Sequence, residues 1–174
     1  MAKHKVYARH NGVGESDRLS IPLIKRCVRD SLCIEGVNVP CEVNVLIIDD
    51  EGIREINSEF RNIDKPTDVL SFPMLEFPLP GWANPGADAI DPETGLIPLG
   101  EIVFSGERVF RQAREFGQSI DQETAYLTVH SVLHLLGYDH IDEGDGKRLM
   151  RSREKAILLE LGLGDRDQGS GIRD

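Results

Sequence analysis

The chain has 174 residues, of which 40% are hydrophobic, and it carries a formal net charge of −10 at pH 7. This length and composition suit one domain with a substantial core, so we expect a single domain over residues 1–161. The acid excess excludes general affinity for nucleic acid. Any RNA would have to be held by a local cationic patch, a metal-centred cleft or a partner protein.

No apolar stretch approaches membrane-spanning length, and residues 1–7 lack the apolar core of a secretory signal. We therefore expect a cytoplasmic protein that does not act at a membrane. The three cysteines, Cys27, Cys33 and Cys41, are odd in number and have no C-x-x-C spacing. Reduced, buried thiols are the simplest interpretation of them.

The first half of the chain predicts alternating strands and helices. Lys5–Arg9 fits an edge strand and Ile21–Leu32 fits a helix. Cys41–Ile48 alternates at first and then becomes apolar on both faces, as an interior strand would. Asp49 or Asp50 can cap the helix that follows. The residues that recur at helical spacing in that helix are Ile53, Ile56 and Phe60.

The middle of the chain predicts two strands separated by a long loop. Thr67–Phe72 fits a strand, and the stretch from Met74 to Pro98 is rich in proline and glycine. A loop of that length in a compact domain is usually functional or mobile. Leu99–Phe104 fits another interior strand, and Ser105 can cap a helix that runs through Phe116.

Two more helices are predicted in the last third. A capping box at Ser119 and Gln122 starts a helix near residue 120, and Gly137 can end it. A second helix is expected over Glu143–Leu161, followed by a disordered tail over residues 162–174. The core contacts expected of that last helix are Leu149, Ala156, Leu158 and Leu159. This order predicts an α+β fold, a small mixed β-sheet packed with helices, whose central helix binds zinc.

The zinc prediction depends on three histidines. His130 and His134 are four residues apart on one face of the apolar helix, and Gly137 can reverse the chain so that His140 approaches as a third ligand. Three imidazoles would leave one position of a single Zn²⁺ ion open for water, as in catalytic sites. The offsets match the metzincin pattern, except that Ser131 stands where the catalytic glutamate would be.

Other charged residues have both a functional and a structural interpretation. Arg61 could bind phosphate through its planar guanidinium, or it could be a helix-end charge, while Asp68 could merely satisfy backbone groups. Asp139 could orient a ligand imidazole or cap the turn after the glycine. Two basic groups fit solvated helix faces better than nucleic-acid contacts. These groups are Arg108, Arg111 and Arg114, and then Lys147, Arg148, Arg151, Arg153 and Lys155.

Three stretches carry a resemblance to a known family. They are F-R-x-x-D-x-P-T-D-V-L-S-F-P, L-G-E-I-V-F-S and H-S-V-L-H-L-L-G-Y-D-H, in this order between residues 60 and 140. Together they resemble the YbeY family of endoribonucleases. Ser131 and Glu101 replace a usual glycine and a usual aspartate, and the loop over residues 74–97 is longer than usual.

The resemblance implies a small α+β domain and a zinc ion held by His130, His134 and His140. It also implies an active-site role for Arg61. The expected activity is cleavage of single-stranded RNA in the maturation of ribosomal RNA, notably at the 3′ end of the small-subunit RNA, and in ribosome quality control. The expected partners are ribosomal RNA, the small ribosomal subunit or its proteins, and an assembly GTPase.

Two other functions stay open at this stage. One is a ribosome-assembly binding factor with a structural metal, and the other is a zinc peptidase or small-molecule hydrolase whose base lies outside the motif. The absence of a glutamate at position 131 and the presence of Arg61 favour phosphodiester chemistry over peptide hydrolysis. Either water or the 2′-hydroxyl of the RNA could be the nucleophile.

Overall fold

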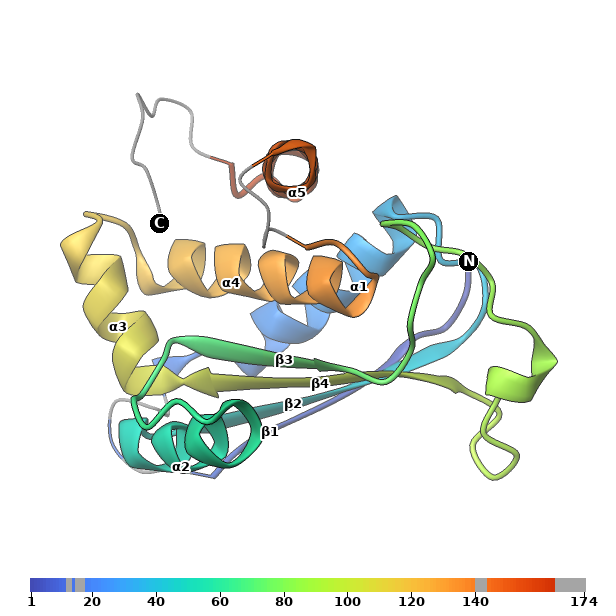
Figure 1. The fold of residues 1–174 in the computed structure, drawn as a ribbon. Helices are drawn as coiled ribbons and strands as arrows, with labels where there is room; N and C mark the ends of the chain where they lie inside the picture. Colours follow the sequence, from blue (N-terminus) through green and yellow to red (C-terminus); the bar gives the residue numbers. More distant parts are fainter. Residues whose placement is uncertain (12–13, 15–17, 140–143, 165–174) are drawn as a thin grey trace.

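The computed structural model describes residues 1–11, 14, 18–139 and 144–164. Within these residues the chain forms four strands, five α-helices and one short 3-10 helix (Figure 1). Residue His140 and the last ten residues of the predicted tail lie outside the described residues. In chain order the elements are β1 (Lys5–His10), α1 (Ile21–Ile34), β2 (Cys41–Ile48), α2 (Asp50–Arg61), β3 (Val69–Pro73), η2 (Ala87–Ala89), β4 (Ile97–Ser105), α3 (Gly106–Glu115), α4 (Ile120–Leu135) and α5 (Asp145–Glu160).

The four strands form one mixed sheet in the order β1-β2-β4-β3. The three strands β1, β2 and β4 are parallel, and β3 runs antiparallel to β4. The edge position predicted for the first strand and the interior positions predicted for β2 and β4 are confirmed. An interior strand is covered on both faces, which explains why its sequence is apolar without strict alternation.

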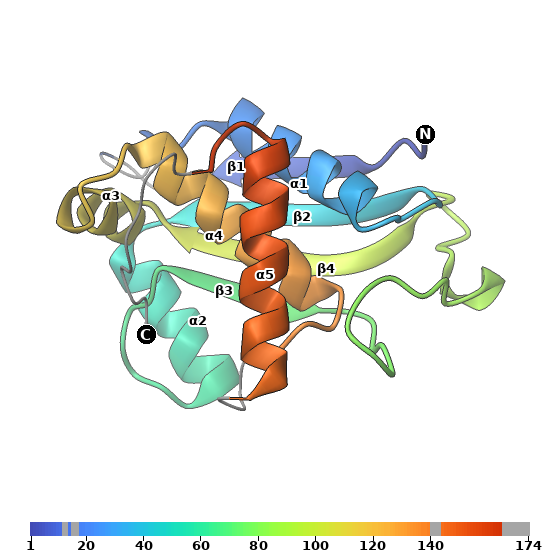
Figure 2. The ribbon, with the colours of Figure 1, turned by 90° about the horizontal axis from the view of Figure 1, so that it is seen from above.

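Helices cover both faces of the sheet (Figure 1). Helices α1 and α4 lie against one face and enclose the main core, while α2 lies on the opposite face over a smaller cluster built around Ile53 and Val103. Viewed from above, α5 crosses over α4 (Figure 2). Helix α4 contacts α1, α3, α5 and β3, so the prediction that it is the central helix is confirmed.

The helix starts follow the capping signals in the sequence. The Ser119 hydroxyl accepts a hydrogen bond from the Gln122 backbone N–H, and the Gln122 side chain accepts one from the Ser119 N–H. Asp49 caps α2 through Gly52 N–H at 2.8 Å. Ser105 caps α3 in the same way. These caps satisfy N–H groups that have no partner within their own helix.

Two of the predicted core positions in α5 are wrong. Leu149 and Leu159 are 43% and 69% exposed, whereas Met150, Glu154 and Ile157 are buried. The helix packs on α4 through the face that carries Glu154, which a hydrophobic pattern does not reveal. In α2 the same kind of error concerns Phe60, which is 63% exposed and makes an edge contact with Phe72.

A long connection joins the neighbouring strands β3 and β4. Its two ends meet where the Met74 N–H donates to the Leu99 carbonyl at 2.9 Å. Part of it packs back on the end of α4, where the Gly81 N–H donates to the Leu136 carbonyl. Residues 83–88 within it are exposed. The connection is therefore closed at its base and open to solvent farther along.

The thiols that were predicted to be reduced and buried differ in how far they are buried. Cys27 and Cys41 are buried, Cys33 is partly exposed, and all three are free thiols. Burial raises the pKa of Cys27 to about 11 and that of Cys41 to about 12, which disfavours their reactive thiolates.

Among the described residues no helix has both the length and the apolar character needed to span a bilayer.

Candidate active site

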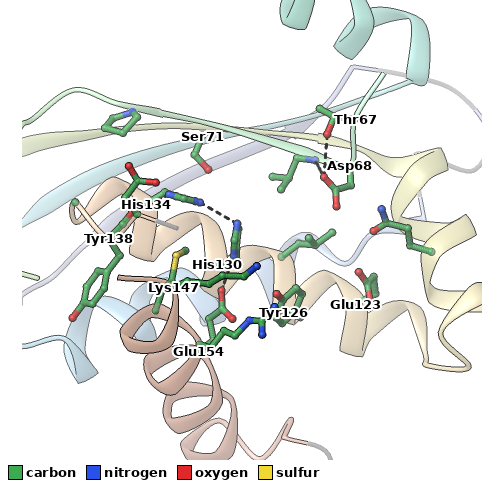
Figure 3. A pocket seen from close by; sticks show the side chains of 18 of the residues that line it. Thr67, Asp68, Ser71, Glu123, Tyr126, His130, His134, Tyr138, Lys147 and Glu154 are labelled. Carbon is green, nitrogen blue, oxygen red and sulfur yellow. Dashed lines mark hydrogen bonds and ion pairs between the residues drawn. The ribbon is translucent and has the colours of Figure 1, made fainter. Parts of the chain in front are cut away.

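A cleft of about 780 Å³ lies between β3 and the α4–α5 pair. Figure 3 shows His130, His134 and Glu123 on the α4 side of this cleft, and Thr67, Asp68 and Ser71 on the β3 side. The end of α2, the end of α3 and the turn after α4 complete its walls. The residues that line it are Arg61, Thr67, Asp68, Val69, Ser71, Pro73, Gln112, Phe116, Glu123, Tyr126, Leu127, His130, His134, Gly137, Tyr138, Asp139, Lys147, Met150, Arg151 and Glu154.

The imidazoles of His130 and His134 point toward each other in the cleft (Figure 3). Their Nε2 atoms are 3.0 Å apart. Each Nδ1 atom has a separate partner, Glu154 Oε1 at 2.6 Å for His130 and the Tyr138 carbonyl at 2.9 Å for His134. Both rings are therefore held from behind while their Nε2 atoms converge.

This arrangement fits a bound cation. The Tyr138 carbonyl can only accept a hydrogen bond, so His134 carries its hydrogen on Nδ1, and the neutral ring has a bare Nε2 lone pair. The carboxylate of Glu154 selects the same tautomer of His130. Nε2 atoms that converge in this way can share a cation, and without one a ring that carries hydrogen on Nε2 donates a hydrogen bond to the other. Two nitrogens that share a tetrahedral zinc ion lie about 3.3 Å apart, close to the spacing found here.

The third predicted ligand, His140, lies outside the described residues. Within the described residues, which omit His140, no three or more histidine, cysteine or acidic side chains are grouped as a metal site. Gly137, which was expected to reverse the chain before it, does adopt a left-handed conformation with φ +84°. Of the three predicted ligands, the structure thus places His130 and His134 together and shows the turn at Gly137 that follows them.

Arg61 and Asp68 lie at the same cleft as the histidines. Arg61 is the last residue of α2, and its Nη2 donates to the Ser71 carbonyl at 3.4 Å. Asp68 accepts a hydrogen bond from the Val69 N–H at 2.7 Å, so the prediction that it satisfies backbone groups is confirmed. The exposed guanidinium of Arg61 thus lines the same cleft as the histidine pair.

The two basic groups have different surroundings. In α3, Arg108 and Arg111 form ion pairs with Asp50, in agreement with a solvated, charge-balanced face. In α5, by contrast, Lys147 and Arg151 line the cleft, and the solvated-face interpretation stays a prediction for these two residues. They are four residues apart, so the helical spacing could have shown that they share a face.

Two residues that hold the histidines were not foreseen. Glu154 is buried although it is charged, and Tyr138 uses its backbone carbonyl, which no side-chain pattern can reveal. Asp139, the predicted orienting residue, lines the cleft, but other groups occupy the Nδ1 atoms of His130 and His134.

The comparisons with known proteins agree on one family. A family model described as Endoribonuclease YbeY matches residues 13–162. The chain is 46% identical to Endoribonuclease YbeY of Clostridium kluyveri (strain NBRC 12016) over 160 residues, which cover 89% of this chain and 96% of that protein. It is 47% identical to the protein of the same name from Clostridium botulinum (strain Loch Maree / Type A3) over 145 residues, 80% of this chain and 87% of that one.

A solved structure has the same fold. The solution structure of TM1509 from Thermotoga maritima matches with a TM-score of 0.54 and 25% sequence identity, over 97% of this chain and 100% of that chain. The α+β prediction is confirmed. With this fold and cleft, the family match and the relatives define a hydrolase of the endoribonuclease class, an enzyme that cuts within an RNA chain. The chain belongs to the Endoribonuclease YbeY family, and the resemblance seen in its motifs is confirmed.

Proposed function

We propose that this endoribonuclease uses one zinc ion to cut single-stranded RNA in the cytoplasm, and that it acts in ribosomal RNA maturation and ribosome quality control. The substrate that we propose is the 3′ end of the small-subunit RNA, presented on the small ribosomal subunit or its proteins with help from an assembly GTPase. One observation carries the metal-dependent part of the proposal. It is the 3.0 Å approach of two imidazole Nε2 atoms inside a cleft that Arg61 lines.

The proposed zinc ligands are His130, His134 and His140. Their offsets support a tripod, because the first two share a helix face and the glycine turn redirects the chain before the third. When bound, zinc supplies a Lewis acid for a phosphate oxygen and lowers the pKa of water toward neutrality. The remaining work falls to the side chains of the cleft.

The cations of the cleft can hold the phosphate from two walls. Arg61 comes from the end of α2, whereas Lys147 and Arg151 come from α5. A guanidinium can donate two parallel hydrogen bonds to a phosphodiester, and it stabilises negative charge that develops on the phosphate oxygens during cleavage. We assign this role to Arg61 and a phosphate-positioning role to the two α5 residues.

Residue 131, which would be the catalytic glutamate in a metzincin-like peptidase, is a serine, and this favours the nuclease proposal. Ser131 is wholly buried and is absent from the cleft lining, so a substitution there could not place a carboxylate beside the histidines without rearranging the core. Glu154, the nearest carboxylate in α5, is engaged by His130. The nucleophile is then either water or the 2′-hydroxyl of the RNA. A 5′-phosphate product indicates water attack, and a 2′,3′-cyclic phosphate indicates the hydroxyl.

The test uses purified, nuclease-free protein loaded with zinc and an end-labelled single-stranded RNA that spans the 3′ end of the small-subunit RNA. We expect His134→Ala to abolish cleavage and Arg61→Ala to lower it by about 10²–10³-fold, the usual loss of one charge-stabilising donor. Arg148→Ala is the matched control for Arg61, because this arginine pairs with Asp145 on the exposed surface of α5. Wild-type protein that binds ribosomes yet cuts no RNA would instead identify an assembly factor.

A further inference from the structure

Helix α5 is connected to both histidines, directly to His130 and through other residues to His134. Its residue Glu154 reaches His130 directly, with 2.6 Å between Oε1 and Nδ1. The preceding residue, Arg153, donates from Nε to Glu35 Oε1 at 2.8 Å. Two consecutive residues of one helix therefore begin two separate chains of contacts.

The second chain of contacts ends at the other histidine. Glu35, just after α1, accepts a hydrogen bond from the Tyr138 hydroxyl at 2.7 Å through its other carboxylate oxygen. Tyr138 in turn accepts from His134 Nδ1 through its backbone carbonyl. Tyr138 is thus held at both ends, by its hydroxyl and by its carbonyl, and contacts connect its hydroxyl through Glu35 to Arg153.

The burial of these groups argues against incidental surface contacts. The side chains of Glu35 and Glu154 are only 3% and 7% exposed. A buried carboxylate is costly unless donors match its oxygens, and here both oxygens of Glu35 and Oε1 of Glu154 have partners.

We infer that α5 positions both histidines for metal binding through two adjacent residues, Glu154 on His130 and Arg153, by way of Glu35 and Tyr138, on His134. The inference rests on the proposed function, because it presumes that the histidine pair binds zinc. Both arms place hydrogen on Nδ1 and leave Nε2 bare, which is the form that a metal needs. These residues are positioning residues, since they act through the histidines.

The first test measures zinc affinity without RNA, by competition with a chromophoric chelator. We expect Glu154→Ala to weaken zinc binding by about 10–100-fold, the usual effect of losing a partner of a ligand imidazole. Glu154→Gln should recover part of this loss, because its amide oxygen can still accept from Nδ1. The matched control is Glu160→Gln, an exposed residue of the same helix, which should leave the affinity unchanged.

The second test addresses the longer arm. Tyr138→Phe removes the hydroxyl and keeps the backbone carbonyl, and Glu35→Gln weakens the link to Arg153. Each should weaken zinc binding by a smaller factor, about 3–10-fold, because the ring is still held by the carbonyl. The Co²⁺-substituted variants should show altered visible absorption, whereas a helix-packing role alone would lower the melting temperature and leave the spectrum unchanged.

The outcomes separate this inference from the proposed function. Wild-type affinity and an unchanged Co²⁺ spectrum in Glu154→Gln and Glu154→Ala would overturn the positioning role, whether or not the protein cuts RNA. Wild-type protein that binds zinc but cuts no RNA would overturn the nuclease assignment and leave the positioning role standing. Wild-type protein with no measurable zinc affinity would overturn both.

Discussion

The cations that line the cleft come from two sides of it. Arg61 ends α2, where Asn62 in the left-handed conformation turns the chain away. Lys147 and Arg151 are one helical turn apart on α5 and lie on the cleft side of that helix. The two walls present their cations to the same cleft. The same lining also contains four acids, Asp68, Glu123, Asp139 and Glu154, so the cleft is not a uniformly basic surface.

Substituting Lys147 or Arg151 with glutamine should weaken substrate binding more than the chemical step. We expect each substitution to lower kcat/KM by about fivefold, or about 1 kcal/mol, mainly through a higher KM. Steady-state cleavage of the labelled RNA measures this. Arg148→Gln removes the same charge from the exposed face of α5 and should stay within about twofold of wild type. Equal losses in all three variants would mean that only the overall charge matters.

The sequence indicated some of these residues and missed others for a physical reason. His130 and His134 were found because helical spacing alone brings their side chains together. Arg61 was found only through the family motif, since nothing local links a helix end to a histidine 69 residues later. Glu154 was missed because its function depends on how α5 packs against α4, which is a tertiary property.

At the scale of elements, close approach of β3 and α4 to β4 depends on Gly100. Its φ is +145°, and a Cβ atom there would lie 2.2 Å from the Phe72 carbonyl oxygen and 2.9 Å from Leu135. No ordinary side-chain shift relieves a clash with backbone. Strand β3, which forms one wall of the cleft, therefore needs a glycine at position 100 of the neighbouring strand β4.

We expect Gly100→Ala to destabilise the protein by about 3 kcal/mol or more, through backbone strain and steric clash together. Gly117→Ala is the control, because Gly117 also has positive φ but no atom lies near its added Cβ. Strain alone should cost about 1 kcal/mol there. Urea denaturation of both variants gives the comparison, and similar losses would show that the space around Gly100 is not restrictive.

The pairing of β1 with β2 includes a buried histidine. His4 precedes β1, and its Nδ1 accepts a hydrogen bond from the N–H of Cys41, the first residue of β2, at 3.3 Å. Burial lowers the pKa of His4 below its ordinary value of 6.5. A proton on Nδ1 would remove the acceptor that Cys41 uses.

The sign of the pH effect follows from that lowered pKa. Below about pH 6.5 the unfolded chain binds a proton at His4 that the folded chain resists, so stability falls as pH falls through this window. We expect the free energy of unfolding to drop more between pH 7.5 and 5.5 in wild type than in His4→Gln, by up to about 1 kcal/mol. Parallel pH profiles of the two proteins would contradict a role for His4.

Element boundaries were predicted well where a local signal defines them. The caps at Ser105 and Ser119 and the left-handed Gly137 act within a few residues of the chain, so the sequence contains all that is needed. The inward face of α5 was not predictable in this way. Leu149 and Leu159 look like core residues, but the contact with α4 selects a different face of the helix.

At the scale of the whole molecule, the net charge of −10 opposes binding of RNA outside the cleft. If only the three cleft cations contact phosphates, the logarithm of the RNA affinity should fall with the logarithm of salt concentration with a slope near −2, since each contact contributes about −0.7. Fluorescence anisotropy over a salt series with the non-cleaving His134→Ala variant measures it. A slope of about −5 would reveal phosphate contacts elsewhere on the surface.

The fold class was predictable from the order of elements, but the arrangement of the sheet was not. Two successive strands followed by a run of three helices, in place of strict alternation, indicate the α+β class. The place of β3 at the edge beyond β4, antiparallel to it, depends on pairing between strands, for which the sequence has no local signal. The cleft exists because this edge strand faces α4.

The closed base of that long connection also makes it useful to the experimenter. Because the bond between Met74 and Leu99 already joins its ends, added length beyond it costs little entropy, about 0.6 kcal/mol for each doubling. A peptide tag or a small fluorescent module spliced into the solvent-facing stretch at residues 83–88 should leave the sheet intact. The enzyme thus offers an internal labelling point, on a segment separate from α4, the helix that carries His130 and His134.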